Sequence, residues 1–222
     1  MLKRIETDGL HCLCAGTGRA GRIAYALYPM DIPAGWLEAE AARHAVDIAV
    51  VTGMEWQDAM SPWPAAGVPR GTPDFKGEAP EFLQMLQHKI LPQAEAALGI
   101  ADAPERTLVG VSMSGLFALW QWLQCDTFAN IASLSGSFWY DGFLDHVKSR
   151  PIPHKSGKAY FLLGNQEAAT RVKAFKSVAA DTAEIVSLLE RSGIDTRFDS
   201  VPGNHYADPL PRLDRALTAL FS

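Results

Sequence analysis

The residues around Ser112 have the types and spacing that make a serine a nucleophile. Ser112 follows an apolar strand-like run at residues 107–111 and precedes an apolar helical run at residues 114–123. A strand that turns sharply into a helix presents the serine hydroxyl above the edge of a sheet, where it can attack an acyl carbonyl. Small residues are needed two positions before and after the serine, and Gly110 satisfies the first. Ser114 stands at the second, where glycine is usual; a helix N-cap is the alternative interpretation of both serines.

A serine nucleophile needs a general base, and His205 is the candidate. It follows the predicted strand at residues 196–201 and precedes the last predicted helix at residues 209–220. This is the position of a catalytic histidine when the chain order is serine, acid, histidine. The alternative interpretation is a polar residue in a surface loop.

Two carboxylates could orient this histidine, because Glu167 and Asp141 each follow a predicted strand. We favour Glu167, which follows the later strand, the usual place of the acid, and has Gly164 just before it to let the backbone turn. Asp141 precedes a predicted short helix at residues 142–147, so a helix N-cap explains it without catalysis.

These residues are placed by alternating strands and helices, which predict an α/β fold with a mostly parallel sheet flanked by helices on both faces. Strands are predicted at residues 10–14, 22–28, 46–52, 107–111, 131–134, 159–163 and 196–201, and helices at 34–44, 80–98, 114–123, 142–147, 173–191 and 209–220. The first two strands are expected to form an N-terminal antiparallel hairpin across a glycine-rich connection at residues 16–21.

Several aromatic side chains are candidates for a substrate pocket. Trp56 and Trp63 lie in residues 54–78, a long excursion expected to cover the site, because long loops of this kind are usually functional. Trp139 lies in a loop after a strand, and Tyr206 directly follows the candidate histidine. Packing in the core is the alternative for the tryptophans.

Two other patterns are set aside as cofactor or metal sites. Residues 16–21 match a dinucleotide-binding motif, but a strand and not a helix is predicted to follow, so no phosphate-binding helix N-terminus results. His11 and the thiols of Cys12 and Cys14 are expected on opposite faces of a strand. We therefore expect neither a cofactor nor a metal.

Length and composition narrow the class of protein. The 222 residues fit a single domain, 1–222, and 48% hydrophobic with 20% charged residues is ordinary for a globular protein. A net charge of −5 with dispersed charges argues against nucleic acid as a partner. No apolar run could span a membrane, the first residues do not form a signal peptide, and three cysteines are too few for a disulfide scaffold, so the expected location is the cytoplasm.

From about residue 22 onward, the chain resembles esterases of the esterase D/enterochelin-esterase superfamily. The resemblance rests on residues 110–120, on residues 133–140 and 202–205, and on the segments 56–58 and 61–65. It implies an α/β-hydrolase fold and a serine carboxylester hydrolase that needs no cofactor. Members include siderophore-ester hydrolases, S-formylglutathione hydrolase, feruloyl esterases and mycolyl transferases, and the resemblance does not choose among them.

In such an enzyme Ser112 attacks, His205 moves the proton and Glu167 orients the imidazole. The oxyanion needs two donors. We expect the backbone N–H of Met113 to be one and, because Pro29 has no N–H, that of Met30 to be the other.

The expected partner is a small-molecule ester with a small or aromatic acyl group, siderophore esters among them, and the expected assembly is a monomer or homodimer. Two alternatives stay open. One is a catalytically silent hydrolase fold that binds a ligand, and the other is an acyltransferase with the same triad.

Overall fold

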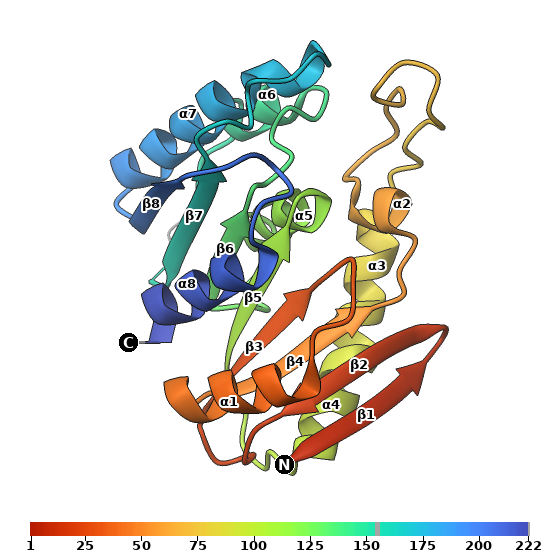
Figure 1. Ribbon diagram of the computed structural model, residues 1–222, viewed down its shortest axis with the longest axis vertical. Helices are drawn as coiled ribbons and strands as arrows, with labels where there is room; N and C mark the ends of the chain where they lie inside the picture. Colours follow the sequence, from red (N-terminus) through yellow and green to blue (C-terminus); the bar gives the residue numbers. More distant parts are fainter. Residues whose placement is uncertain (154–155, 222) are drawn as a thin grey trace.

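The computed structural model, which describes residues 1–153 and 156–221, contains an eight-stranded sheet with helices on both faces (Figure 1). The strand order is β1-β2-β4-β3-β5-β6-β7-β8. Every neighbouring pair from β4 to β8 is parallel, whereas β1–β2 and β2–β4 are antiparallel. The strands are β1 (Leu2–Thr7), β2 (Leu10–Ala15), β3 (Arg22–Leu27), β4 (Asp47–Thr52), β5 (Glu105–Val111), β6 (Asn130–Leu134), β7 (Lys158–Gly164) and β8 (Asp195–Val201). The predicted fold class is confirmed.

The helices divide into two layers. Apolar side chains of α1 and α8 pack on one face of the sheet, and those of α2 to α7 pack on the other. The helices are α1 (Ala34–His44), α2 (Trp56–Met60), α3 (Ala79–Met85), α4 (Leu91–Leu98), α5 (Met113–Trp122), α6 (Phe143–Lys148), α7 (Val178–Arg191) and α8 (Pro209–Phe221), with a π-helical turn at Leu86–Ile90 and a 3-10 turn at Ala174–Ser177. The central parallel strands β3 to β7 are buried over most of their length on both faces, as continuous apolar runs such as β4 predict, whereas the edge strand β8 is mostly exposed.

The N-terminal hairpin is present, but its strands are not the predicted ones. It pairs β1 with β2, whereas β3 pairs in parallel with β4 and β5. The sequence of β1 has only two apolar residues, Leu2 and Ile5, and they do not alternate, so this edge strand gives little signal. The glycine-rich segment 16–21 therefore connects two strands that have β4 between them.

That connection is shaped by Asp47 at the start of β4. Its Oδ1 accepts hydrogen bonds from the N–H groups of Thr17 (2.7 Å) and Gly18 (2.9 Å). A Cβ at Gly16, where φ is +147°, would lie 1.9 Å from the same oxygen. The glycines thus serve close packing against a carboxylate, and the strand predicted after them is β3.

The predicted helix at residues 80–98 is observed as α3, the π-helical turn and α4 in succession. Pro92, at the start of α4, has no N–H to give to the preceding turn. The widened turn at Leu86–Ile90 ends two residues before this proline, where it accommodates the missing hydrogen bond.

The long excursion at residues 54–78 is more ordered than its sequence predicts. It contains α2 and a two-way backbone hydrogen-bonded bridge between Ala65 and Phe75. In Figure 1 it rises at the end of the sheet where the parallel strands finish, on the side of α2 and α3. It is therefore placed at the edge where loops of this architecture gather.

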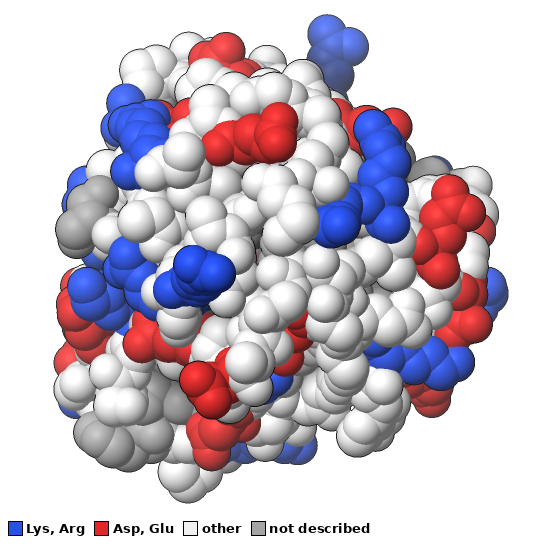
Figure 2. All heavy atoms as spheres, turned by 90° about the horizontal axis from the view of Figure 1, so that it is seen from below, with Lys and Arg blue, Asp and Glu red and all other residues white. Residues whose placement is uncertain are grey.

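One face of the molecule carries mixed charge (Figure 2). On the face drawn in Figure 2, Lys and Arg side chains are interspersed with Asp and Glu side chains and with uncharged residues. Within the described residues, no helix has the length and apolar character needed to cross a bilayer.

Candidate active site

Ser112 lies in the turn between β5 and α5, as predicted. Its backbone has φ +55° and ψ −119°, a strained conformation for a residue with a side chain. The turn is tight because strand and helix nearly touch: a Cβ at Gly110 would lie 2.0 Å from the carbonyl oxygen of Ser114. Gly110 is therefore required by the close approach, which is the local reason that this sequence forms the turn.

Ser114 takes a structural role in the same turn. It is fully buried, and its Oγ accepts the N–H of Val111 (2.8 Å) and lies 2.8 Å from the carbonyl oxygen of Leu27, to which it can donate. The hydroxyl thus links β5 to β3 where glycine would make no such contact. Ser114 is not among the described residues that line the pocket, so its role here is structural.

The imidazole of His205 reaches Ser112 from the loop between β8 and α8. The distance from His205 Nε2 to Ser112 Oγ is 3.1 Å. On the other side of the ring, Nδ1 lies 2.9 Å from Oε2 of Glu167. An ionised carboxylate can only accept, so Nδ1 carries the proton and Nε2 is free to accept from the serine hydroxyl. The structure therefore brings together the three residues that the chain order predicts.

Glu167 is buried, with 7% of its surface exposed, at the turn after β7. Its Oε1 accepts hydrogen bonds from Ser135 Oγ (2.6 Å), Gly164 N–H (2.7 Å) and Arg212 (3.0 Å). Burial alone would raise the pKa of this carboxyl. Hydrogen bonds, from His205 first and then from Ser135 and Gly164, outweigh burial and hold the pKa below its usual value. The group is therefore a carboxylate at neutral pH.

The rival acid, Asp141, does not reach the histidine. Its side chain is exposed, and its backbone carbonyl accepts the indole N–H of Trp63 (3.0 Å). The expectation that Asp141 caps the following helix is wrong, because Gly142 is the N-cap of α6 and no side chain caps it.

The two expected oxyanion donors differ in position. Met113 is the first residue of α5 and lines the pocket beside Ser112, and the first N–H groups of a helix have no partner within it. Met30 is 53% exposed and is not among the described residues that line the pocket. Ser137, which the sequence did not single out, lines it, and its Oγ lies 3.4 Å from that of Ser112. Ser137 follows β6, and this place after a parallel strand is the sequence signal that could have identified it as a site residue.

Ser112 opens into a cavity of about 650 Å³. Its walls come from the excursion, the loop after β6, the segment between β7 and α7, and the histidine loop. Aromatic rings form one side: Trp139 lies 4.5 Å from Phe175 and 6.4 Å from Phe75, measured between ring centroids. The one arginine among the lining residues is Arg171. A cavity of this size and mostly apolar lining is typical of small-molecule sites.

Comparisons with known proteins identify the family of this chain. A family model described as "Esterase: Putative esterase" matches residues 23–218. The chain belongs to this esterase family. A curated relative, "Uncharacterized protein YbbA" of Bacillus subtilis (strain 168), is 23% identical over 162 residues, which are 71% of this chain and 65% of the relative. The match thus spans slightly less than two thirds of that protein.

Solved structures show the same fold at low identity. An IroE-like serine hydrolase from Shewanella oneidensis superimposes with a TM-score of 0.77 at 19% identity, covering 100% of this chain and 79% of the other. Siderophore hydrolase EstA from Aspergillus nidulans gives a TM-score of 0.73 at 16% identity, covering 99% of this chain and 93% of the other. These likenesses establish the fold of this esterase-family member as the α/β-hydrolase fold.

Two of the four expected substrate-binding residues are at the cavity of this family member, and two are not. Trp139 and Tyr206 line it, and Tyr206 is 88% exposed at its rim. Trp56 and Trp63 are not among the described lining residues. The Trp63 ring lies 4.9 Å from that of His146, and its carbonyl oxygen accepts the hydroxyl of Tyr140, so it fastens the excursion to the region after β6.

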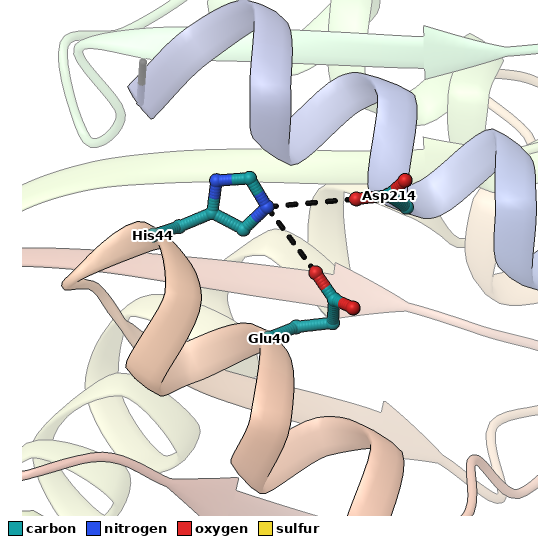
Figure 3. A group of neighbouring side chains, drawn as sticks. All are labelled: Glu40, His44 and Asp214. Carbon is teal, nitrogen blue, oxygen red and sulfur yellow. Dashed lines mark ion pairs between the residues drawn. The ribbon is translucent and has the colours of Figure 1, made fainter.

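Within the described residues, one cluster has side chains of metal-ligand type, and it lies where α1 meets α8, away from the triad. His44 Nε2 is 3.2 Å from Glu40 Oε2 and 3.5 Å from Asp214 Oδ1 (Figure 3). Arg43 binds both of those oxygens, at 3.3 Å and 2.7 Å. Since a guanidinium already compensates both carboxylates, we assign this cluster to helix packing.

The cysteines are placed as the strand alternation predicts. Cys12 and Cys14 are buried on one face of β2 with their sulfur atoms 3.4 Å apart, and His11 is exposed on the other. The hydrogen bond with the Cys14 thiol, and after it burial, raises the pKa of Cys12. Both thiols are buried in the core, away from the cavity, and we assign them to packing and not to nucleophilic chemistry.

Proposed function

We propose that this protein is a serine carboxylester hydrolase in which Ser112, His205 and Glu167 form the catalytic triad. One observation carries the proposal: a continuous chain of hydrogen bonds runs from the buried carboxylate through the imidazole to a serine hydroxyl that opens into the aromatic-lined cavity. Family membership supports it independently.

The reaction follows from this geometry. His205 Nε2 takes the proton of Ser112 as its Oγ attacks the acyl carbonyl carbon, and the backbone N–H of Met113 binds the oxygen that becomes negative. The imidazolium, stabilised by Glu167, then gives its proton to the leaving alkoxide, and an acyl-serine remains. Water activated by the same imidazole releases the acid and frees the serine.

The residues that line the cavity indicate the class of ester that it could bind. Phe75, Trp139 and Phe175 offer aromatic surface suited to an aryl or small apolar acyl group. Two structural neighbours are named as siderophore-related or IroE-like hydrolases, so aryl siderophore esters belong in the first panel of substrates. Because the triad leaves the acyl acceptor open, product analysis with and without added alcohols separates hydrolysis from acyl transfer.

A fluorophosphonate probe tests the proposed nucleophile without knowledge of the substrate. We expect the wild-type protein to be labelled and to hydrolyse 4-nitrophenyl esters, and Ser112→Ala to lose labelling and roughly 10³-fold or more of turnover. Ser114→Ala is the matched control; it should keep labelling while losing stability on the order of 1–3 kcal/mol, because the partly buried N–H of Val111 loses its acceptor. Labelling that persists in Ser112→Ala and disappears in Ser114→Ala would reverse the assignment, and an unreactive wild type would indicate a silent binding protein.

A further inference from the structure

Arg212 on α8 lies directly behind the proposed catalytic acid. Its side chain is 5% exposed, so the guanidinium is almost wholly removed from water. Nη1 donates to Glu167 Oε1 (3.0 Å) and to Ser135 Oγ (2.5 Å), and Nη2 donates to the carbonyl oxygen of Asn204 (2.7 Å). A buried guanidinium destabilises the fold unless its N–H groups have hydrogen-bond acceptors, and these contacts supply them.

The three partners belong to loops that follow three different strands. Ser135 comes after β6, Glu167 after β7, and Asn204 after β8, immediately before His205. The hydrogen bond between Glu167 and His205 joins two of these loops, so its length depends on how they are held relative to each other. The planar guanidinium of Arg212 on α8 donates hydrogen bonds to both of these loops and so fixes their relative positions.

The two carboxylate oxygens of Glu167 also have different hydrogen-bond partners. Oε1 of Glu167 is taken by Arg212, Ser135 and the Gly164 N–H, and Oε2 is left for the imidazole of His205. A carboxylate with one oxygen anchored in this way cannot rotate to present a different lone pair. The positive charge further stabilises the ionised form of a group that burial alone would drive toward neutrality.

The backbone leaves room for this arginine. A Cβ at Gly164 would lie 2.8 Å from Arg212 Nη2 and 2.5 Å from the carbonyl oxygen of Gly203. Gly203 itself has φ +110°, a conformation that L side chains rarely adopt. Glycines therefore stand on both loops where the guanidinium passes between them.

We propose that Arg212 is a positioning residue for the ester-cleaving reaction: it fixes the Glu167 carboxylate and the His205 loop in the geometry that keeps the imidazole aligned on Ser112. This inference rests on the proposed function, and it assigns Arg212 an effect on the chemical step through Glu167. A purely structural ion pair would instead lower stability and leave the rate of the folded enzyme unchanged.

The test compares Arg212→Met with Arg43→Met. Arg43 is the matched control, because it also binds a carboxylate of α8, Asp214 (2.7 Å), but where α8 meets α1 and not at the cavity. For each variant, kcat and KM with 4-nitrophenyl acetate, the rate of fluorophosphonate labelling and the thermal unfolding midpoint are measured. We expect Arg212→Met to lower kcat and the labelling rate roughly 10- to 100-fold, the usual effect of removing a group that orients a functional side chain, with KM changed less than about threefold. Arg43→Met should retain wild-type kinetics.

A double variant shows whether Arg212 acts through the acid. If it does, adding Arg212→Met to Glu167→Gln should lower kcat by less than about threefold beyond Glu167→Gln alone, because the two residues work as a unit. Multiplied losses would contradict the proposal, as would wild-type kinetics in Arg212→Met.

If Arg212→Met does not fold, Arg212→Lys gives the answer. It keeps the buried charge but not the planar fork that reaches both loops. A folded Arg212→Lys should show kcat at least about tenfold below wild type, and unchanged kinetics would overturn the inference. A wild-type protein that neither hydrolyses the ester nor labels would remove the proposed function itself, whereas an active wild type with an unimpaired Arg212→Met contradicts this inference alone.

Discussion

Four hydrogen bonds hold the Glu167 carboxylate, and they orient it or stabilise its ionised form. Oε2 faces His205, whereas the donors on Oε1 offset the loss of water around a buried charge. Asp141 has none of these partners and is exposed. At the scale of single residues, then, the two candidate acids differ in environment more than in sequence position.

This difference predicts opposite outcomes for two amide substitutions. Glu167→Gln should lower kcat for an aryl ester by up to about 10⁴-fold, because the histidine loses its favoured tautomer and its imidazolium loses stabilisation. Asp141→Asn should stay near the wild-type rate. Both kcat values are measured on the same ester, with circular dichroism to check folding. A collapse of kcat in Asp141→Asn with an active Glu167→Gln would move the acid one strand earlier.

At the scale of elements, the excursion at residues 54–78 has two separate roles, one in lining the cavity and one in packing. One group of its residues, including Val68 and Phe75, lines the cavity. Trp63 instead lies against Tyr140, Phe143 and His146 and holds the excursion in place. The segment thus forms a wall of the site without contributing Trp63 to it.

Substituting one residue from each group should separate these roles. Phe75→Ala should change relative kcat/KM values across a panel of acetyl, butyryl and benzoyl esters, because it removes aromatic surface from the cavity. Trp63→Ala should lower stability by on the order of 2–4 kcal/mol, since a large ring leaves its packing, with less change in ester preference. Preference is measured by competition between esters and stability by urea unfolding. A shift in preference confined to Trp63→Ala would return that residue to the substrate site.

For the whole molecule, the buried carboxylate of Glu167 makes stability depend on pH. The pKa of Glu167 is lowered on folding, so its carboxylate contributes stability that is complete above its unfolded value near 4.5 and is lost as pH falls through the lower folded value. Asp58 and Asp199 also have lowered pKa values, through Lys76 and Arg197 respectively, and add to acid sensitivity.

A comparison between wild type and Glu167→Gln isolates the contribution of the triad acid, because Asp58 and Asp199 are present in both. The difference between their unfolding midpoints should be largest near pH 7 and shrink as the pH falls below about 4.5, where the wild type loses the charge that the variant never had. Unfolding midpoints from pH 7 to pH 3.5 test this. A difference independent of pH would show that the Glu167 charge adds no stability.

Local signals in the sequence were enough for the parts of the molecule that local physics decides. The turn at Ser112 follows from an apolar strand, a small residue at Gly110 and an apolar helix, all within a few positions of each other. The helix at residues 34–44 was predicted with its observed bounds, since 3.6-residue periodicity reports one buried face. Chain order placed Glu167 and His205 because parallel strands end at a common edge of the sheet.

Contacts between residues far apart in the sequence determine the features of the fold and of the site that local signals do not predict. Nothing near β2 in the sequence indicates that β4 and not β3 pairs with it, because strand neighbours are chosen by packing across the whole sheet. Trp63 has the type expected at a pocket, but the direction of its ring is set by Tyr140, Phe143 and His146, which only the folded chain brings near. Met30 was expected at the site for its backbone N–H, and the tertiary structure leaves it exposed and outside the described residues that line the cavity. In the sequence, Arg212 is indistinguishable from any other charged residue of an amphipathic helix. In the folded chain, three loops bring acceptors to its guanidinium, and these contacts make it the buried partner of Glu167.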